Sequence, residues 1–222
     1  MYIYVPMILL TLLLSDLQAR VRRKWEKVFV FMVTLVPPTL VSAFRYNNGA
    51  DYPMYFKLFK DIGSGHYIST VTGKSLEKGF MLLVKVCQTI NDEQCFTFGI
   101  IALIVIALVF KGCINTSQDY KLSVLLFFVT GIYFDSFNGL RQYIAMAVFF
   151  YGIKHIFFKD IKKYILCCLA GSLFHKSILF MIPLYFVQFV KIDLKRAMVL
   201  ILTGTLSATI IYKVILTILA YT

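Results

Sequence analysis

The sequence predicts an all-α, polytopic membrane protein with about eight membrane-embedded helices, some short or re-entrant, around an outward-facing polar cavity. Apolar residue types make up 59% of the 222 residues and charged types only 15%, whereas soluble domains carry about 25% charged residues. The mean hydropathy is +0.78. The apolar runs are continuous, which excludes the every-second-residue alternation of a membrane β-barrel. Residues 1–222 are therefore expected to form a single transmembrane domain.

The net charge of +12 does not point to nucleic acid, because the basic residues lie in short clusters between apolar runs. Such clusters are typical of cytoplasmic loops of membrane proteins. The five cysteines have no metal-site spacing and are expected to be small buried side chains. The placement of the basic residues therefore favours the lipid bilayer, and not a nucleic acid, as the partner of this protein.

The first two predicted helices cover residues 1–14 and 28–44. The basic cluster at 20–27 follows the first apolar run, whereas a cleaved signal peptide carries its positive charge before that run. We therefore expect an uncleaved first helix with the N-terminus outside the membrane and the cluster inside.

Residues 45–74 form the one long polar stretch and are expected to be an external loop. Within it, Asp51, Tyr52 and Pro53 are typical of the start of a helix, whose apolar face would lie at the membrane interface. The helix expected over 75–90 contains Glu77, Lys78 and Lys85. It is therefore predicted to be interfacial or re-entrant and not a full span.

The remaining apolar runs complete the topology. Residues 164–190 are interrupted at His175 and lie between two basic loops, so we expect a hairpin of two short helices with His175 near its apex. The other predicted helices cover 95–110, 122–134, 140–158 and 198–221.

This topology brings several ionisable residues to the outer side of the membrane. Polar groups at membrane depth are tolerated where they line a protein-enclosed cavity, so their convergence is the main functional signal. The residues concerned are Arg45, Asp51, Glu77, Asp135, Arg141 and His175.

Each of these residues also has a plain structural explanation. Arg141 begins a helix, where a guanidinium beside free N–H groups suits a diphosphate; this is the favoured interpretation, and a salt bridge to Asp135 is the alternative. Arg45 fits a snorkelling anchor and Asp51 a helix N-cap. Glu77 favours the first turn of its helix. His175 fits either a hydrogen-bonded structural residue or a proton-transfer group.

Motifs for other chemistries are missing from the sequence. The three histidines lie far apart, so no metal site is predicted. Neither nucleotide-binding glycine motif is present. Transport driven by nucleotide hydrolysis is therefore not expected.

Four segments together resemble the EpsG family. Residues 42–46 with 49–52 (SAFRY and GADY) are similar to its R…G-x-D-Y…Y signature, and residues 77–80 (EKGF) to its next motif. Residues 137–145 (FNGLRQYIA) resemble its R-Q-x-I-A helix start, and residues 170–177 (AGSLFHKS) its A-x-x-F-H-x-S segment. The four occur in the family's order.

The resemblance implies a polymerase of exopolysaccharide, capsule or O-antigen repeat units in the bacterial cytoplasmic membrane, a Wzy-like glycosyltransferase of broadly GT-C type. Its substrate would be an oligosaccharide on undecaprenyl diphosphate at the outer face, with a flippase and chain-length or export proteins as partners. No cofactor, metal or nucleotide is implied. The site residues carried over are Glu77, His175 and Asp51 for acid–base catalysis, and Arg45, Arg141, Gln142 and Tyr52 for the diphosphate and sugar.

Family members are generally longer, with further membrane helices after the histidine motif, so we expect a C-terminally truncated product or a fragment. Three alternatives stay open. An O-antigen ligase would carry a large late external loop, and a lipid-linked-glycan transporter would show internal repeats. A non-catalytic assembly subunit would need no catalytic residues.

Overall fold

The computed structural model describes residues 2–65, 76–190, 193, 197–199, 201–205, 207 and 212. Within these residues the protein contains ten α-helices and one 3₁₀ helix, so the predicted all-α fold is confirmed. The chain divides into two compact units, residues 1–185 and 186–222. Every residue of the candidate site lies in the first unit.

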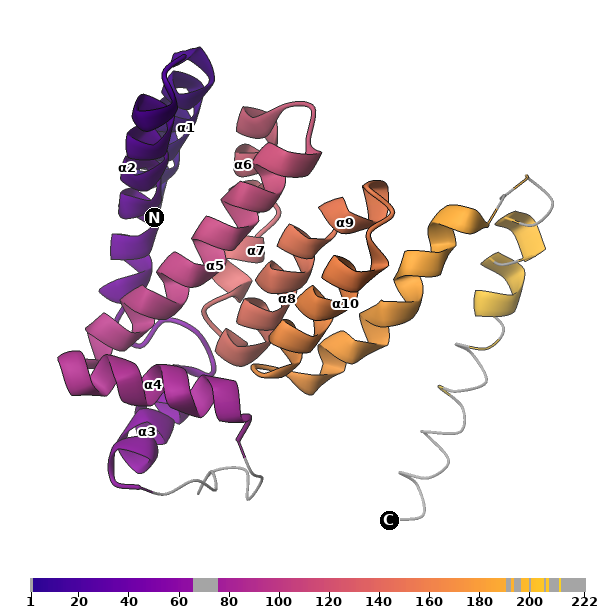
Figure 1. Cartoon of the computed structure of the whole chain (residues 1–222). Helices are drawn as coiled ribbons and strands as arrows, with labels where there is room; N and C mark the ends of the chain where they lie inside the picture. Colours follow the sequence, from indigo (N-terminus) through magenta and orange to yellow (C-terminus); the bar gives the residue numbers. More distant parts are fainter. Residues whose placement is uncertain are drawn as a thin grey trace, which may run out of the picture. The chain divides into compact units, whose positions relative to one another are not determined.

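The long helices of the first unit lie side by side in the order α1, α2, α5, α8, α10, and α6 packs against α1 and α5 (Figure 1). Their bounds are Tyr4–Arg20 for α1, Lys24–Ala43 for α2, Gln94–Thr116 for α5, Tyr120–Val129 for α6, Leu140–Gly152 for α8 and Ile161–Ser172 for α10. The helix α1 runs six residues beyond the predicted end at residue 14. Two ion pairs stabilise this extension, from Asp16 to Arg20 at 2.6 Å and to Lys121 of α6 at 3.3 Å.

Two shorter helices, α3 (Tyr52–Gly63) and α4 (Lys78–Ile90), lie across the ends of α2 and α5 (Figure 1). The helix α3 confirms the predicted short helix in the polar stretch, although residues 66–74 of that stretch lie outside the described residues. Its buried face joins α4, α5 and α8 in one hydrophobic cluster, centred on Tyr55, Phe59, Phe80 and Phe98. The charged residues of the candidate site lie next to this hydrophobic cluster.

Two predicted helices are divided in the structure. The run 122–134 splits into α6 and α7 (Ile132–Asp135) because Gly131 adopts a left-handed φ of +85°, a conformation that glycine takes without steric cost. The run 140–158 splits into α8 and α9 (Lys154–Phe157). Ile153 between them keeps helical backbone angles, so this second break interrupts hydrogen bonding without turning the chain.

The predicted hairpin over 164–190 is confirmed for the residues that belong to the first unit of the chain. The helix α10 ends at Ser172, and the 3₁₀ helix η1 (Lys176–Phe189) begins directly after His175. The hydroxyl of Tyr164 donates to the carbonyl of Met181 at 2.6 Å, and the rings of Tyr164 and Tyr185 lie 5.7 Å apart. These contacts show that η1 folds back along α10, with His175 at the apex.

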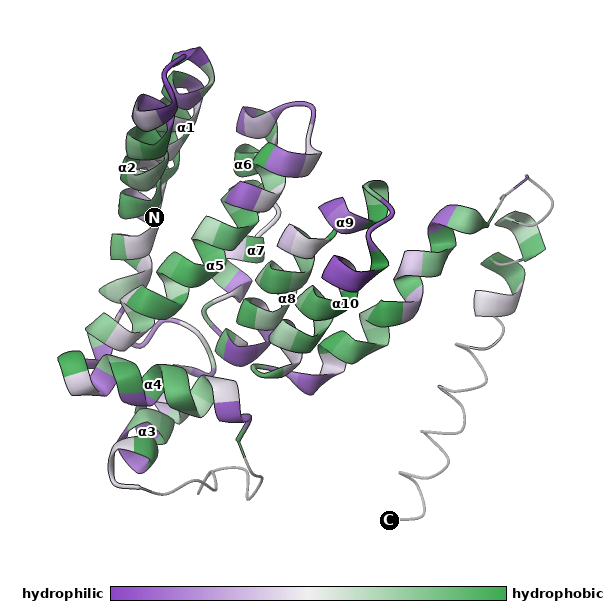
Figure 2. Ribbon diagram, viewed as in Figure 1, coloured by the Kyte–Doolittle hydropathy of each residue, from purple (hydrophilic) through white to green (hydrophobic). Residues whose placement is uncertain are grey.

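Hydrophilic residues gather at the two ends of the first unit (Figure 2). Figure 2 shows hydrophilic residues at the α1–α2, α5–α6 and α9–α10 turns, which lie at one end of the unit, while α3, α4 and the α7–α8 turn lie at the other. Among the described residues, two helices, α2 and α5, are long and apolar enough to cross a membrane. The larger number of spans and the orientation of the N-terminus stay predictions.

The second unit is described over short stretches only. Residues 197–199 and 201–205 are helical, and the hydroxyl of Ser207 donates to the carbonyl of Thr203, one turn earlier, at 2.8 Å. Most of the helix predicted over 198–221 lies outside the described residues.

Candidate functional site

Three predicted site residues from distant parts of the chain meet in one charged cluster, which we call the Glu77 cluster (Glu77, Arg141 and His175). Nη1 of Arg141 donates to Oε2 of Glu77 at 2.7 Å, and Nδ1 of His175 lies 3.4 Å from Oε1 of the same carboxylate. The side chains are 12%, 23% and 31% exposed, in the order Glu77, Arg141, His175. The Glu77 carboxylate is thus nearly enclosed by protein, whereas the guanidinium of Arg141 and the imidazole of His175 remain partly accessible to a ligand.

The contact between His175 and Glu77 is looser than that of Arg141. The distance from Nδ1 of His175 to Oε1 of Glu77 is within ion-pair range, but this nitrogen is buried and has no hydrogen bond to any described residue. The two groups thus lie close together without the alignment that a hydrogen bond requires. Catalytic hydrogen bonds are often long in the absence of substrate and shorten when it binds.

The backbone explains why the cluster forms where it does. Glu77 is the N-cap residue of α4, Arg141 is the second residue of α8, and His175 follows α10. The amide of Gly79 donates to the carbonyl of Leu173 at 3.0 Å, which joins the start of α4 to the end of α10. A Cβ atom on Gly79 would lie 2.7 Å from that carbonyl oxygen, so this close approach requires glycine.

Arg141 does not pair with Asp135, which was the alternative explanation of its position. Asp135 is exposed at the end of α7, and the carboxylate that Arg141 contacts belongs to Glu77, 64 residues earlier in the chain. Nε of Arg141 is buried and has no partner among the described residues. The guanidinium therefore has a donor that the protein does not use, at the N-terminal end of a helix.

Tyr55 is a site residue that the sequence reasoning did not select. It is buried on α3, and its phenol lies close enough to Arg141 for the guanidinium to act on its pKa. Burial raises the pKa of Tyr55, and the nearby Arg141 offsets part of that rise. The sequence did contain a signal that could have selected Tyr55. This residue follows the D-Y pair of the first motif by three residues, which places it one helical turn from Tyr52.

Arg45 lies apart from the Glu77 cluster and is largely enclosed by protein groups. It is 7% exposed, and its guanidinium carbon lies 4.4 Å and 4.6 Å from the ring centres of Phe98 and Phe137. It donates to Oγ of Ser42 at 3.2 Å and to the carbonyl of Phe137 at 3.1 Å. Burial lowers the pKa of Arg45 to about 10, which leaves it protonated at neutral pH.

The loop that Arg45 contacts leads directly into the cluster. Oδ1 of Asn138 accepts from the amide of Asp51 at 3.4 Å, and a Cβ atom on Gly49 would lie 2.7 Å from the same oxygen. Gly49 has a φ of +108°, so glycine is required there for both conformation and space. The first motif therefore supports residues 137–139, from which α8 and Arg141 begin.

The other predicted residues lie around this loop. Asp51 occupies the N-cap position of α3, but its carboxylate makes no capping hydrogen bond. Tyr52 stacks on Phe98, with ring centres 5.3 Å apart and an interplanar angle of 18°. Gln142 is exposed on the first turn of α8. None of these three belongs to the Glu77 cluster itself.

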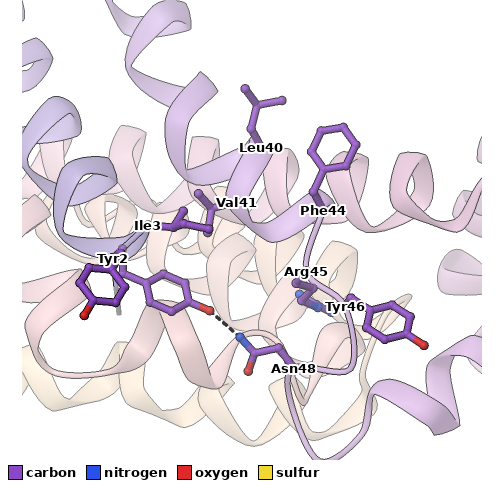
Figure 3. A pocket seen from close by; sticks show the side chains of 9 residues that line it. Tyr2, Ile3, Leu40, Val41, Phe44, Arg45, Tyr46 and Asn48 are labelled. Atoms are coloured by element: carbon purple, nitrogen blue, oxygen red, sulfur yellow. Dashed lines mark hydrogen bonds between the residues drawn. The ribbon is translucent and has the colours of Figure 1, made fainter.

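Arg45 and Tyr46 form the boundary between two pockets. The first, of about 570 Å³, lies between the start of α1 and the end of α2 (Figure 3). Its walls combine apolar side chains such as Ile3 and Leu40 with Arg45 and Asn48, and Nδ2 of Asn48 donates to the hydroxyl of Tyr4 at 2.5 Å. The second pocket, of about 470 Å³, lies on the α3 and α5 side of Arg45.

Within the described residues, no group of three or more histidine, cysteine or acidic side chains is placed to bind a metal ion. His155 lies on α9, and His66 lies outside the described residues.

The fold and the site together define an all-α protein with two helices of membrane-spanning length and a carboxylate–guanidinium–imidazole cluster at one end. The chain belongs to the EpsG family, which it matches over residues 27–222. This membership confirms the resemblance carried by the four motifs and implies involvement in polysaccharide biosynthesis, in the context of lipid-linked glycans. No curated protein and no solved structure gave a significant match.

Proposed function

We propose that the protein polymerises undecaprenyl-diphosphate-linked oligosaccharide repeat units at the outer face of the bacterial cytoplasmic membrane. The observation that supports this proposal best is the Glu77 cluster. Three of the four family motifs each contribute one chemically active side chain to it, and these meet within 2.7–3.4 Å. A group that can accept a proton and a group that can hold an anion are thus adjacent.

The proposed reaction is a glycosyl transfer between two lipid-linked glycans. A hydroxyl oxygen of the acceptor attacks the anomeric carbon of the donor, and the bond from that carbon to the diphosphate oxygen breaks. The electron pair leaves with the lipid diphosphate, and the hydroxyl proton passes to a base on the protein. Because attack and departure occur at one carbon, the base and the anion-binding group must lie close together.

His175 and Glu77 are the proposed proton-accepting pair. Nδ1 of His175 lies 3.4 Å from the Glu77 carboxylate without an aligned hydrogen bond in the described part of the chain; we propose that substrate binding aligns this pair and leaves the other ring nitrogen to take the proton from the hydroxyl. A carboxylate beside imidazole orients the ring and stabilises the imidazolium as it forms. Asp51, the third candidate, lies at the start of α3 outside this pair, so we assign it a secondary role near the substrate.

Arg141 is the proposed ligand of the departing diphosphate. Its guanidinium retains an unpartnered Nε and stands at the N-terminal end of α8, where free N–H groups and the helix dipole favour an anion. Arg45 uses two of the five N–H groups of a guanidinium in its bonds to Ser42 and Phe137. The positive charge of Arg45 and the apolar wall of the pocket in Figure 3 suit the start of a polyprenyl diphosphate.

The test is complementation of a polymerase-deficient strain of the same species, with glycan length read on a gel. We expect long polymer with the wild-type chain, and single repeat units with Glu77→Gln or His175→Asn at equal membrane abundance. The matched control is Glu26→Gln, which removes a carboxylate that pairs with Arg23 at the opposite end of the first unit. This variant should still make long polymer.

Two results would count against the proposal. Long polymer with both cluster variants would show that the cluster is not catalytic. Lipid-linked units that accumulate on the inner face of the membrane in the variants, and on the outer face with the wild type, would indicate a transporter.

A further inference from the structure

The pocket on the α3 and α5 side of Arg45 has a lining unlike the hydrophobic core beneath it. It has a volume of about 470 Å³ and lies between the end of α2, the first turns of α3 and the start of α5. Aromatic rings line one part of it and hydrogen-bonding side chains another. The members used below are Arg45, Tyr46, Tyr52, Phe56, Glu93 and Gln94. We call it the α3–α5 pocket.

The aromatic part of the α3–α5 pocket is held in place by ring packing. Tyr52 lies flat against Phe98, and Tyr46 meets Tyr52 edge to face, with ring centres 6.2 Å apart. Tyr46 is nevertheless 87% exposed. An aromatic ring that is positioned by a neighbour, yet open to its surroundings, is suited to contact the carbon–hydrogen face of a ligand while its hydroxyl bonds to water or ligand.

The polar part contains acceptors that the protein leaves unused. Glu93 is the N-cap residue of α5, but its side chain makes no capping hydrogen bond. Gln94 donates to the carbonyl of Phe56 at 3.4 Å, while its own Oε1 is buried without a partner in the described part of the chain. A buried amide oxygen without a partner is costly, and a ligand hydroxyl would supply the missing donor.

A second unpartnered group lines the same pocket. Arg45 is more than nine-tenths buried, and its Nε has no hydrogen bond among the described residues. Glu93 thus offers an exposed acceptor, while Gln94 and Arg45 each hold an unpartnered buried group in the pocket's wall, which a ligand reaches once the side chain rotates. A sugar ring has matching features, since its hydroxyls both donate and accept hydrogen bonds and its carbon–hydrogen faces are apolar.

The α3–α5 pocket lies close to the Glu77 cluster along α3. Tyr52 faces the pocket, and Tyr55, one helical turn later, lies near Arg141. Residues three apart on a helix have Cβ atoms about 5–6 Å apart. A glycan whose reacting sugar occupies the cluster would therefore be able to place a neighbouring sugar in the pocket.

From this arrangement we infer that the α3–α5 pocket is a saccharide-binding subsite. It holds an uncharged sugar ring of the glycan, stacked on Tyr46 and hydrogen-bonded to Glu93 and Gln94. The acidic side chain of Glu93 disfavours an anionic sugar in the same position. The inference rests on the proposed function for its choice of ligand, and its test uses binding, which does not require turnover.

The experiment measures binding of a lipid-free oligosaccharide to the full chain in lipid nanodiscs by calorimetry and by saturation-transfer NMR. The probe is the repeat-unit oligosaccharide released by mild acid from the lipid-linked intermediates of the polymerase-deficient strain. Tyr46→Ala and Glu93→Gln should each raise the dissociation constant roughly tenfold, which corresponds to the loss of one good contact. Neither change removes a core side chain, because Tyr46 and Glu93 are exposed.

Two controls match these changes in residue type at the opposite end of the first unit. Phe157→Ala removes an exposed aromatic ring from α9, and Glu26→Gln removes a carboxylate from α2. Both should bind the oligosaccharide like the wild type.

The outcomes separate the two proposals. Weakened binding in Tyr46→Ala and Glu93→Gln supports the subsite, even if the wild-type chain makes no polymer and the proposed function fails. Equal binding by all variants, or no binding by the wild type, overturns the subsite. A loss in Tyr46→Ala that Phe157→Ala shares equally also overturns it, because the ring would then act as a membrane-interface anchor.

Discussion

Replacing Gly79 by alanine tests whether the close approach of α4 to α10 sets the geometry of the Glu77 cluster. The added Cβ would lie 2.7 Å from the carbonyl oxygen and 2.8 Å from the Cβ of Leu173, whereas ordinary contact begins at 3.4 Å. The shortfall is about 0.7 Å, and backbone must move to provide it. Such movement would lengthen the hydrogen bond from Gly79 to Leu173 and carry Glu77 away from His175.

The expected size of the effect follows from this shift. Overpacking costs about 1–3 kcal/mol, and the better helix propensity of alanine returns at most about 1 kcal/mol, so the free energy of unfolding should fall by about 1–2 kcal/mol. A misplacement near 1 Å at a catalytic group can cost about 100-fold in rate. A shift somewhat smaller than that should reduce polymer synthesis by about tenfold or more.

The assay pairs polymer length in the complemented strain with thermal unfolding of the purified chain in detergent. Gly204→Ala is the matched control, because Gly204 lies in a helical stretch with no atom within 4 Å of the added Cβ. It should leave polymer unchanged and should not lower the melting temperature, since alanine has the better helix propensity. If Gly79→Ala also makes polymer of wild-type length and melts like the wild type, the close approach does not position the cluster.

Three further predictions concern the supports of the site. Arg141→Ala should lower the free energy of unfolding by about 1–3 kcal/mol, since it leaves the Glu77 carboxylate unpaired. In denaturant titrations, the double variant with Glu77→Gln should recover part of that loss. Strictly additive losses would disprove the coupling between the two residues. Burial lowers the pKa of Arg45 to about 10 from 12.5, so between these values the unfolded chain binds more protons. The stability of the wild type should therefore rise relative to Arg45→Gln as the pH increases above 10, and a constant difference would contradict this. Tyr133→Phe removes a buried hydrogen bond of 2.7 Å to the carbonyl of Pro38 and should cost about 1 kcal/mol, measured as a lower melting temperature; an unchanged melting temperature would show that this bond does not help to hold α7 on α2.

Local features of the fold were predictable because they depend on neighbours in sequence. The Asp51-Tyr52-Pro53 triplet marks the start of α3, and the polar interruption at His175 marks the turn between α10 and η1. The bend at Gly131 was not predicted. A glycine inside an apolar run is compatible with a continuous helix, and the packing of Tyr133 and Phe137 in the core, which accompanies the left-handed conformation, depends on residues distant in sequence.

Which residues come together in the site was less predictable from the sequence. Motif order identified Glu77, Arg141 and His175 as chemically active residues, but their spacing in sequence carries no information on distance in space. The sequence therefore offered Asp135, six residues away, as the alternative partner of Arg141, whereas the carboxylate that it contacts is Glu77. Tyr55 was missed for a related reason, since an apolar helix face explains a buried tyrosine until its neighbour across the interface is known.

The order of the cluster along the chain has a consequence for the synthesis of the protein. A chain leaves the ribosome from its N-terminus, so Glu77 and Arg141 are made well before α10. The backbone bond that fixes the start of α4 needs the carbonyl of Leu173, and the imidazole arrives two residues later. If the proposed chemistry holds, a nascent chain is inert toward lipid-linked glycans until α10 and His175 have been synthesised and packed against α4.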